Sequence, residues 1–287
     1  MITKSAAEAN LLRMGVSPAS LFVLGALAVA STVGVLAAKA KSADDDAGPG
    51  LPGDAKAFGF VVRGDAAPLA HVPLLEATRA FTIGLTNGPV HGVPPTTAHR
   101  DAARRVVERE LDRYPPTVLR RIRLAGVVLT ADLTENEMAI PSLPNVGGLL
   151  LLDTRATEAD LVRVLHHEVF HFFDLADDGV VAPDAAWEAL NPLGFLYGSG
   201  GRTLRGAWAA KPTSDLPGVV SAYATSGVEE DKAETFSFAM SDPAFVNERA
   251  AADPAVRAKL DELVRRLAAV TPDAPRRLGL PPPISRP

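Results

Sequence analysis

The sequence predicts an α+β domain with a small mixed sheet, preceded by an apolar N-terminal helix. Two runs rich in Val and Leu, residues 122–133 and 146–153, lie between Pro, Gly and Asn turn residues and are typical of buried or half-buried strands. Helical patterns with capping residues occur at residues 158–176 and again from residue 226 onwards. These observations together favour strands packed against helices in one domain.

The apolar N-terminal stretch predicts export. No charged residue occurs between Arg13 and Lys39, and residues 21–38 are almost wholly apolar. This run is longer than the roughly 7–15 apolar residues of a secretory signal, and residues 16–38 are about long enough to cross a bilayer. We expect residues 1–40 to be a membrane anchor or a cleaved signal peptide. The protein is then exported and either membrane-anchored or secreted.

Composition sets the boundaries of the domain. Residues 41–55 combine an acidic run with Gly and Pro, which predicts a flexible linker. The Pro-rich stretch 271–287 has the same character and predicts an extended tail. Residues 56–270 then fit a single domain.

Charge and cysteine content exclude some classes of function. The formal net charge is −5 and the basic residues form no block, so nucleic acid is not an expected partner. The chain has no cysteine, so any metal must be held by His, Asp or Glu.

Capping residues and prolines place the first helices. Residues 96–113 are compatible with a helix, which Pro115 and the next proline interrupt. Thr157 and Asp160 form a pair of the capping-box type directly after the second strand. We therefore expect a helix over residues 158–176.

The C-terminal part is predicted to be helical. Ser226 and Glu229 form a second capping pair, and Pro243 and Pro254 divide the rest of this part into short helices. Between the two helical parts, the aromatic and Gly-rich residues 187–201 fit either a wall over a cleft or a small separate core.

A His-Glu-Val-Phe-His segment lies in the middle of the first strongly predicted helix. Residues four apart share one helix face, so His167 and His171 can bind one metal ion from the same side. Glu168 then lies beside the ion, where it can take a proton from water, as a zinc hydrolase requires. His166 points about 100° away from His167 and is interpreted as a structural or pocket-wall residue.

A catalytic zinc ion needs a third protein ligand. The best candidates are Glu230 and Glu234, which share one face of the second predicted helix. The neighbouring acids Glu229 and Asp231 are explained by a solvated helix face and by the helix dipole. The residues alone leave the choice between Glu230 and Glu234 open.

These two blocks together resemble a known family. The His167–His171 segment, Asp174 three residues later, and Tyr223 seven residues before Glu230 resemble the gluzincin metallopeptidases of the anthrax lethal factor type. They also resemble bacterial zinc-binding metallopeptidases. The resemblance covers roughly residues 149–240, and it implies a zincin-like domain in which the first predicted helix is the active-site helix.

The resemblance assigns roles to several residues. It implies that Glu230 is the third zinc ligand and that Tyr223 stabilises the oxyanion. It also implies that Glu234 and Asp174 do not bind the metal themselves but orient the residues that do. Asp174 lies on the same helical stripe as His171, where it can accept an imidazole N–H. Phe170 departs from the family, which often has Gly at this position.

The sequence therefore predicts a zinc metallopeptidase that cleaves peptide bonds in a protein or peptide, with Glu168 as general base. The fold class that the resemblance implies makes the strand at residues 148–152 the expected sheet edge for pairing with an extended substrate. The alternative is a non-catalytic zinc-binding or structural cell-envelope protein that retains the metal site.

Overall fold

The computed structural model of the chain describes residues 55–62, 72–85, 88–201 and 212–280. The chain divides into two compact units at residue 35, and every described residue belongs to the second unit. The predicted signal or anchor, and the predicted linker up to residue 54, lie outside the described ranges. Within those ranges, no helix combines the length and the apolar character needed to cross a bilayer.

The described residues form a mixed α+β fold, as predicted. Their strands all precede residue 154, and the elements after that point are helices. The elements are β1 (Phe60–Val62), β2 (Leu74–Ala77), β3 (Phe81–Leu85), β4 (Gly88–Val93), α2 (Thr97–Leu111), α3 (Pro116–Arg121), β5 (Gly126–Glu135), β6 (Met138–Ala139), β7 (Ser142–Val146), β8 (Leu149–Asp153), α4 (Glu158–Asp178), α5 (Ala185–Glu188), the 3-10 helix η4 (Tyr223–Ser226), α6 (Val228–Ser241), α7 (Pro243–Ala252), α8 (Pro254–Val270) and α9 (Ala274–Arg277).

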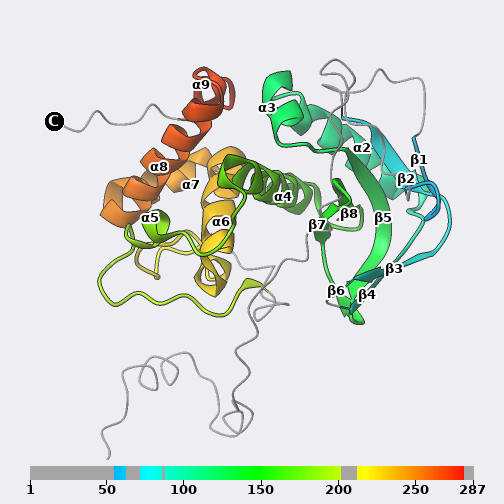
Figure 1. The fold of residues 1–287 in the computed structure, drawn as a ribbon, viewed down its shortest axis with the longest axis horizontal. Helices are drawn as coiled ribbons and strands as arrows, with labels where there is room; N and C mark the ends of the chain where they lie inside the picture. Colours follow the sequence, from blue (N-terminus) through cyan, green and yellow to red (C-terminus); the bar gives the residue numbers. More distant parts are fainter. Residues whose placement is uncertain (1–54, 63–71, 86–87, 202–211, 281–287) are drawn as a thin grey trace, which may run out of the picture. The chain divides into compact units, whose positions relative to one another are not determined.

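The long strand β5 is the centre of the sheet (Figure 1). Its first half pairs in parallel with β2 and β8, and its second half pairs antiparallel with β4 and β6. Val127 and Leu129 join the core shared with the helices, whereas Val128 and Leu133 join a second core formed mainly by the strands. The sheet is therefore buried on both faces at β5, which explains the continuous apolar run that predicted this strand.

The free edge of the sheet differs from the prediction. Strand β8 pairs with β5 on one side and with β7 on the other, so the expectation that residues 148–152 form an edge is wrong. Among the described strands, β7 is the edge on this side, because it pairs with β8 only. It is irregular: its register shifts between Leu143 and Val146, and Asn145 has a φ of 58°.

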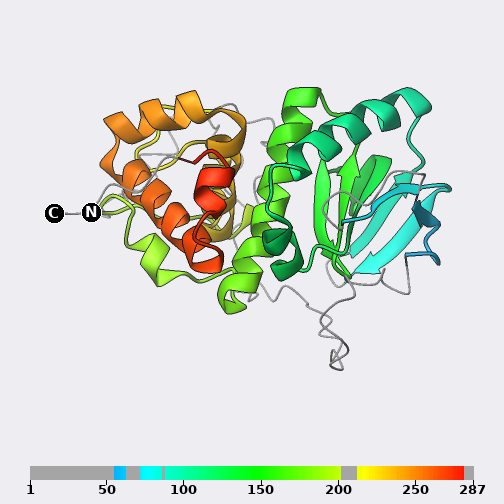
Figure 2. The same cartoon turned by 90° about the horizontal axis from the view of Figure 1, so that it is seen from above.

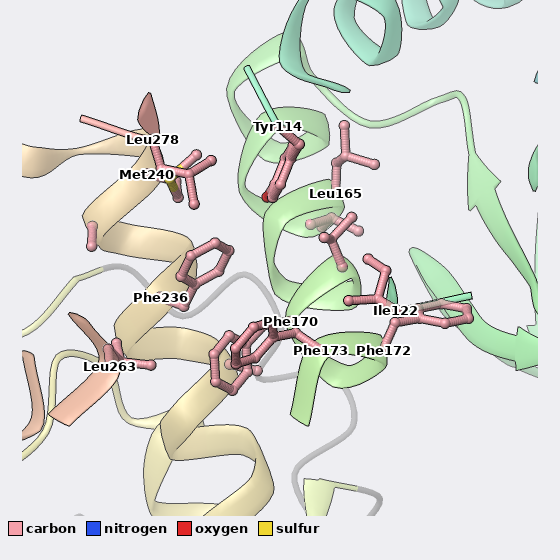
Figure 3. Packing of buried hydrophobic residues seen from close by; sticks show 14 of the residues in the cluster. Tyr114, Ile122, Leu165, Phe170, Phe172, Phe173, Phe236, Met240, Leu263 and Leu278 are labelled. Atoms are coloured by element: carbon pink, nitrogen blue, oxygen red, sulfur yellow. The ribbon is translucent and has the colours of Figure 1, made fainter. Parts of the chain in front are cut away.

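Helix α4 lies between the sheet and the helices α6 to α9 (Figures 1 and 2). The Thr157 hydroxyl accepts the N–H of Asp160 at its start, as predicted, and Gly179 ends the helix with a φ of 82°. Apolar side chains of α4 pack against both neighbouring layers. Figure 3 shows Phe172 pointing toward Ile122, while the Phe170 ring faces Phe236 of α6 at a centroid distance of 5.2 Å.

The start of α6 corrects one predicted cap. The N-cap residue is Gly227, and it makes no side-chain cap hydrogen bond. The hydroxyl of Ser226 instead donates to the carbonyl of Tyr223 within η4, so the predicted pairing of Ser226 with Glu229 is wrong. The predicted division at Pro243 and Pro254 is confirmed, because α7 and α8 begin at these residues.

The predicted tail is wrong for residues 271–280. This stretch contains α9, and Ala274, Leu278 and Leu280 are buried in the main core. Arg113 adds a hydrogen bond to the carbonyl of Leu278. The sequence did not predict this docking, because three apolar side chains are too few among prolines and arginines to indicate a buried face. Residues 281–287 of the predicted tail lie outside the described ranges.

We predict that Leu278→Ala lowers the free energy of unfolding by about 2–5 kcal/mol, because it leaves a cavity in the core. Arg276→Ala is the matched control, since this side chain is 80% exposed, and it should change the free energy by less than about 0.5 kcal/mol. Denaturant unfolding of both variants measures the difference. Equal, small effects would mean that these residues do not dock.

Candidate metal centre

Helix α4 brings the two motif histidines onto one face. The Nε2 atoms of His167 and His171 are 3.1 Å apart, and both rings point toward α6. His167 is buried and His171 is partly exposed. The helical spacing that predicted a shared face therefore places two nitrogen donors side by side.

Helix α6 supplies the carboxylate that completes the cluster. Oε2 of Glu230 lies 3.0 Å from Nε2 of His167 and 3.6 Å from Nε2 of His171. One ligand atom from each of the three residues lies within 4.8 Å of the others, and the described residues contain no other such group. Of the two candidates from sequence, Glu230 is thus the carboxylate that faces both Nε2 atoms.

Glu234 lies behind His167. Its Oε1 atom accepts the Nδ1–H of His167 at 2.9 Å, so that Nε2 is the nitrogen left for a metal once His167 is neutral. Arg163 donates to Oε1 at 3.1 Å, and the Ser221 hydroxyl donates to Oε2 at 2.6 Å. A carboxylate in this position orients a metal-binding imidazole and raises its basicity.

Asp174 does not take its expected place. Its carboxylate pairs with Lys232 at 2.6 Å and with no imidazole N–H among the described residues. Burial raises the pKa of Asp174 to about 6, although Lys232 and His171 act in the opposite direction. The prediction that Asp174 supports His171 is therefore wrong. The carboxylate forms an ion pair with a buried lysine instead, and the sequence did not indicate that this lysine is buried.

Glu168 directly follows His167 in α4, and its side chain is hydrogen-bonded to the sheet. The Ser142 hydroxyl, on β7, donates to Oε1 of Glu168 at 2.6 Å. The Oε2 atom is buried and has no hydrogen-bond partner among the described residues. A buried carboxylate oxygen without a donor is costly, so this atom is suited to receive a proton or hydrogen bond from a bound molecule.

Tyr223 completes the surroundings of the cluster. Its ring centroid is 5.9 Å from that of His167. Burial, followed by the negative charges of Glu230 and Glu168, raises the pKa of Tyr223 far above its usual value. The phenol is therefore protonated at neutral pH and can donate a hydrogen bond.

Electrostatics couple the histidines to the carboxylates. Burial lowers the pKa of His167, but hydrogen bonds to Glu230 and Glu234 outweigh it and raise the pKa to about 10. The same contacts with His167 and His171 hold the pKa of Glu230 far below its usual value, against the effect of burial. Without metal, a positive imidazolium thus lies against a negative carboxylate.

Two nitrogen donors and one carboxylate fit a zinc ion better than the hard cations, which prefer oxygen ligands. His167, His171 and Glu230 would hold the ion. The support of Nδ1 of His167 by Glu234 and the unpartnered Oε2 of Glu168 fit the same occupant.

Residues 187–201 belong to the hydrophobic core at their first end and line the metal centre at their last end. Trp187 is fully buried and donates through Nε1 to Asp231. Gly198 and Gly200 donate their N–H groups to carbonyls of η4. At Gly201, an added Cβ would lie 2.0 Å from Oε1 of Glu230, so the backbone itself forms one side of the metal centre.

Several buried charges were missed from sequence. Asp231, expected on a solvated face, is fully buried and pairs with Lys259, which is equally buried. Lys232 is also buried and pairs with Asp174 and Asp184. The available signal was the set of apolar residues that follow the acids in α6, which indicated that much of this helix packs against the core: Ala233, Phe236, Phe238, Ala239 and Met240.

His166 has the structural role that its direction predicted. It is fully buried, with Nδ1 2.6 Å from the Tyr114 hydroxyl and Nε2 3.1 Å from Oε2 of Glu110. Burial lowers its pKa, despite the hydrogen bond to Glu110. These contacts anchor α4 to α2 on the side away from the cluster.

Comparison with family models, curated proteins and solved structures found no match for this chain. The family resemblance therefore stays a prediction, and the geometry of the cluster carries the functional argument.

We predict that zinc binding to the metal-free protein releases on the order of one proton at neutral pH. His167 is protonated below its pKa of about 10, and its Nε2 must lose that proton to bind metal. Zinc affinity should accordingly rise with pH and level off near pH 10. Calorimetric titrations in buffers with different ionisation enthalpies measure the proton release. A pH-independent affinity would contradict the assignment.

We predict that Gly201→Ala weakens zinc binding by roughly 10- to 100-fold, because the new methyl group displaces a ligand and its surroundings. The added Cβ would lie 2.0 Å from Glu230 and 2.4 Å from the Tyr223 hydroxyl. Gly84→Ala is the control, since nothing lies within 4 Å of a Cβ there. Competition with a chelating dye measures both affinities, and equal values would place the ligand elsewhere.

Proposed function

We propose that this chain is a zinc-dependent metallopeptidase that hydrolyses peptide bonds in a protein or peptide. The observation that carries the proposal is the convergence of His167, His171 and Glu230 beside the unpartnered oxygen of Glu168. Two His and one Glu are a ligand set of catalytic zinc, which keeps one coordination position open for water or substrate.

The chain's own residues supply the remaining chemistry. Zinc, when bound, would polarise the scissile carbonyl and lower the pKa of water toward neutrality. Oε2 of Glu168 accepts the proton that water loses as its oxygen bonds to the carbonyl carbon, and Glu168 then gives this proton to the leaving amine as the C–N bond breaks. The protonated phenol of Tyr223 donates a hydrogen bond to the oxyanion.

The surrounding fold supports a peptide as substrate. The edge strand β7 packs against α4, so an extended chain paired with β7 would pass in front of the metal centre. A zincin-like fold is part of this proposal, as is an exported protein that is either membrane-anchored or secreted. The proposed location is supported by the predicted signal or anchor in residues 1–40.

The main alternative is a zinc-binding or structural protein without catalytic activity. A structural zinc site is closed by four protein ligands. Among the described residues, no fourth His, Asp or Glu joins the cluster, and Asp174, the candidate for that role, pairs with Lys232. An open three-residue set favours catalysis.

We predict that Glu168→Gln retains zinc and loses peptide hydrolysis, with kcat reduced at least 10²- to 10⁴-fold, about the contribution of a general base. Glutamine keeps the shape of the side chain but cannot accept the proton. Glu248→Gln, on the exposed side of α7, is the control and should behave as wild type. Metal analysis and cleavage of a peptide library measure the two properties.

Two results would count against the proposal. If Glu168→Gln cleaves as well as wild type, Glu168 is not the general base. If the wild-type protein holds clearly less than one zinc ion per chain after reconstitution, the motif is accidental and a structural role becomes the better interpretation.

A further inference from the structure

The contact between Ser142 and Glu168 joins two layers of the fold. Ser142 lies on β7, at the sheet edge, whereas Glu168 lies on α4, and their side chains meet at 2.6 Å. Both side chains are buried, with exposed fractions of 7% for Ser142 and 4% for Glu168. Water therefore competes little for this hydrogen bond.

The strand holds Ser142 firmly. Ser142 pairs with Leu152 in the ladder between β7 and β8, and the N–H of Asp153 donates to the carbonyl of Pro141 at 2.8 Å. Strand β8 is buried throughout and is itself paired on both sides. The hydroxyl is thus placed by the sheet and not by a loop.

The hydrogen bond makes the two oxygens of Glu168 unequal. Oε1 accepts from Ser142, while Oε2 has no partner among the described residues. The carboxylate cannot rotate about its terminal bond without breaking this contact. Oε1 is therefore occupied by the hydrogen bond to Ser142, and Oε2 is the oxygen that can accept a proton from water.

We propose that Ser142 is a positioning residue that fixes Glu168 as general base and couples its position to strand β7. This inference rests on the proposed function. An extended substrate that pairs with β7 would contact the same strand that holds Glu168. Strand β7 would then determine both the position of the substrate and the orientation of Oε2.

The test compares Ser142→Ala and Ser142→Thr in the zinc-loaded full chain. Alanine removes the hydroxyl and should lower kcat by about 10- to 100-fold, the size of effect that a misplacement of about 1 Å produces, with KM and zinc content unchanged. Threonine keeps a hydroxyl and should restore most of kcat. Ser241→Ala removes a hydroxyl that bonds within α6 and should match wild type.

A second measurement does not depend on activity. Infrared difference spectra between each protein and its Glu168→Gln form isolate the carboxylate bands of Glu168. The separation of the antisymmetric and symmetric stretches should change in Ser142→Ala and return in Ser142→Thr. If wild type cleaves no peptide, the proposed function fails, and the infrared bands still decide the role of Ser142.

Unchanged carboxylate bands in Ser142→Ala would overturn the inference, whatever the activity. A loss of kcat that Ser142→Thr does not restore, or that comes with lost zinc, would also overturn it, because the effect would then be one of general structure.

Discussion

The buried carboxylate of Glu234 ties the two central helices together. It accepts hydrogen bonds from His167 and Arg163 of α4 and from Ser221, in the segment before η4. A buried charge is tolerated only when such donors compensate it. The hydrogen bond between Glu234 and His167 fixes the orientation of the imidazole ring and the position of α6 relative to α4. It therefore also determines where Glu230 lies relative to the two histidines.

The rest of α6 obeys the same constraint. Asp231 pairs with Lys259, and Lys232 pairs with Asp174, all four of them buried. Removing one partner of a buried pair costs about 3–5 kcal/mol, since a charge is left uncompensated. A small rotation of α6 would break several pairs at once, so the helix has one orientation in which its charges are satisfied.

Local periodicity made part of this predictable. His167, His171 and Glu230 lie on helices whose spacing is visible in the sequence, and the strand at β5 shows as a continuous apolar run. Ser142 was missed, because its contact with Glu168 depends on strand pairing and layer packing. Asp231 was wrongly expected to be exposed, because charged residues ordinarily lie at the surface. It is buried because Lys259 and Trp187, on distant segments of the chain, pair with its carboxylate.

The irregular edge strand has a consequence for the behaviour of the protein in solution. A regular edge would be a template on which a second copy could add a strand and begin to aggregate. Pro144 has no N–H to offer, and Asn145, with its φ of 58°, interrupts the pleat. Strand pairing beside Glu168 is therefore limited to a short stretch, which suits a peptide segment better than the long strand of a second copy.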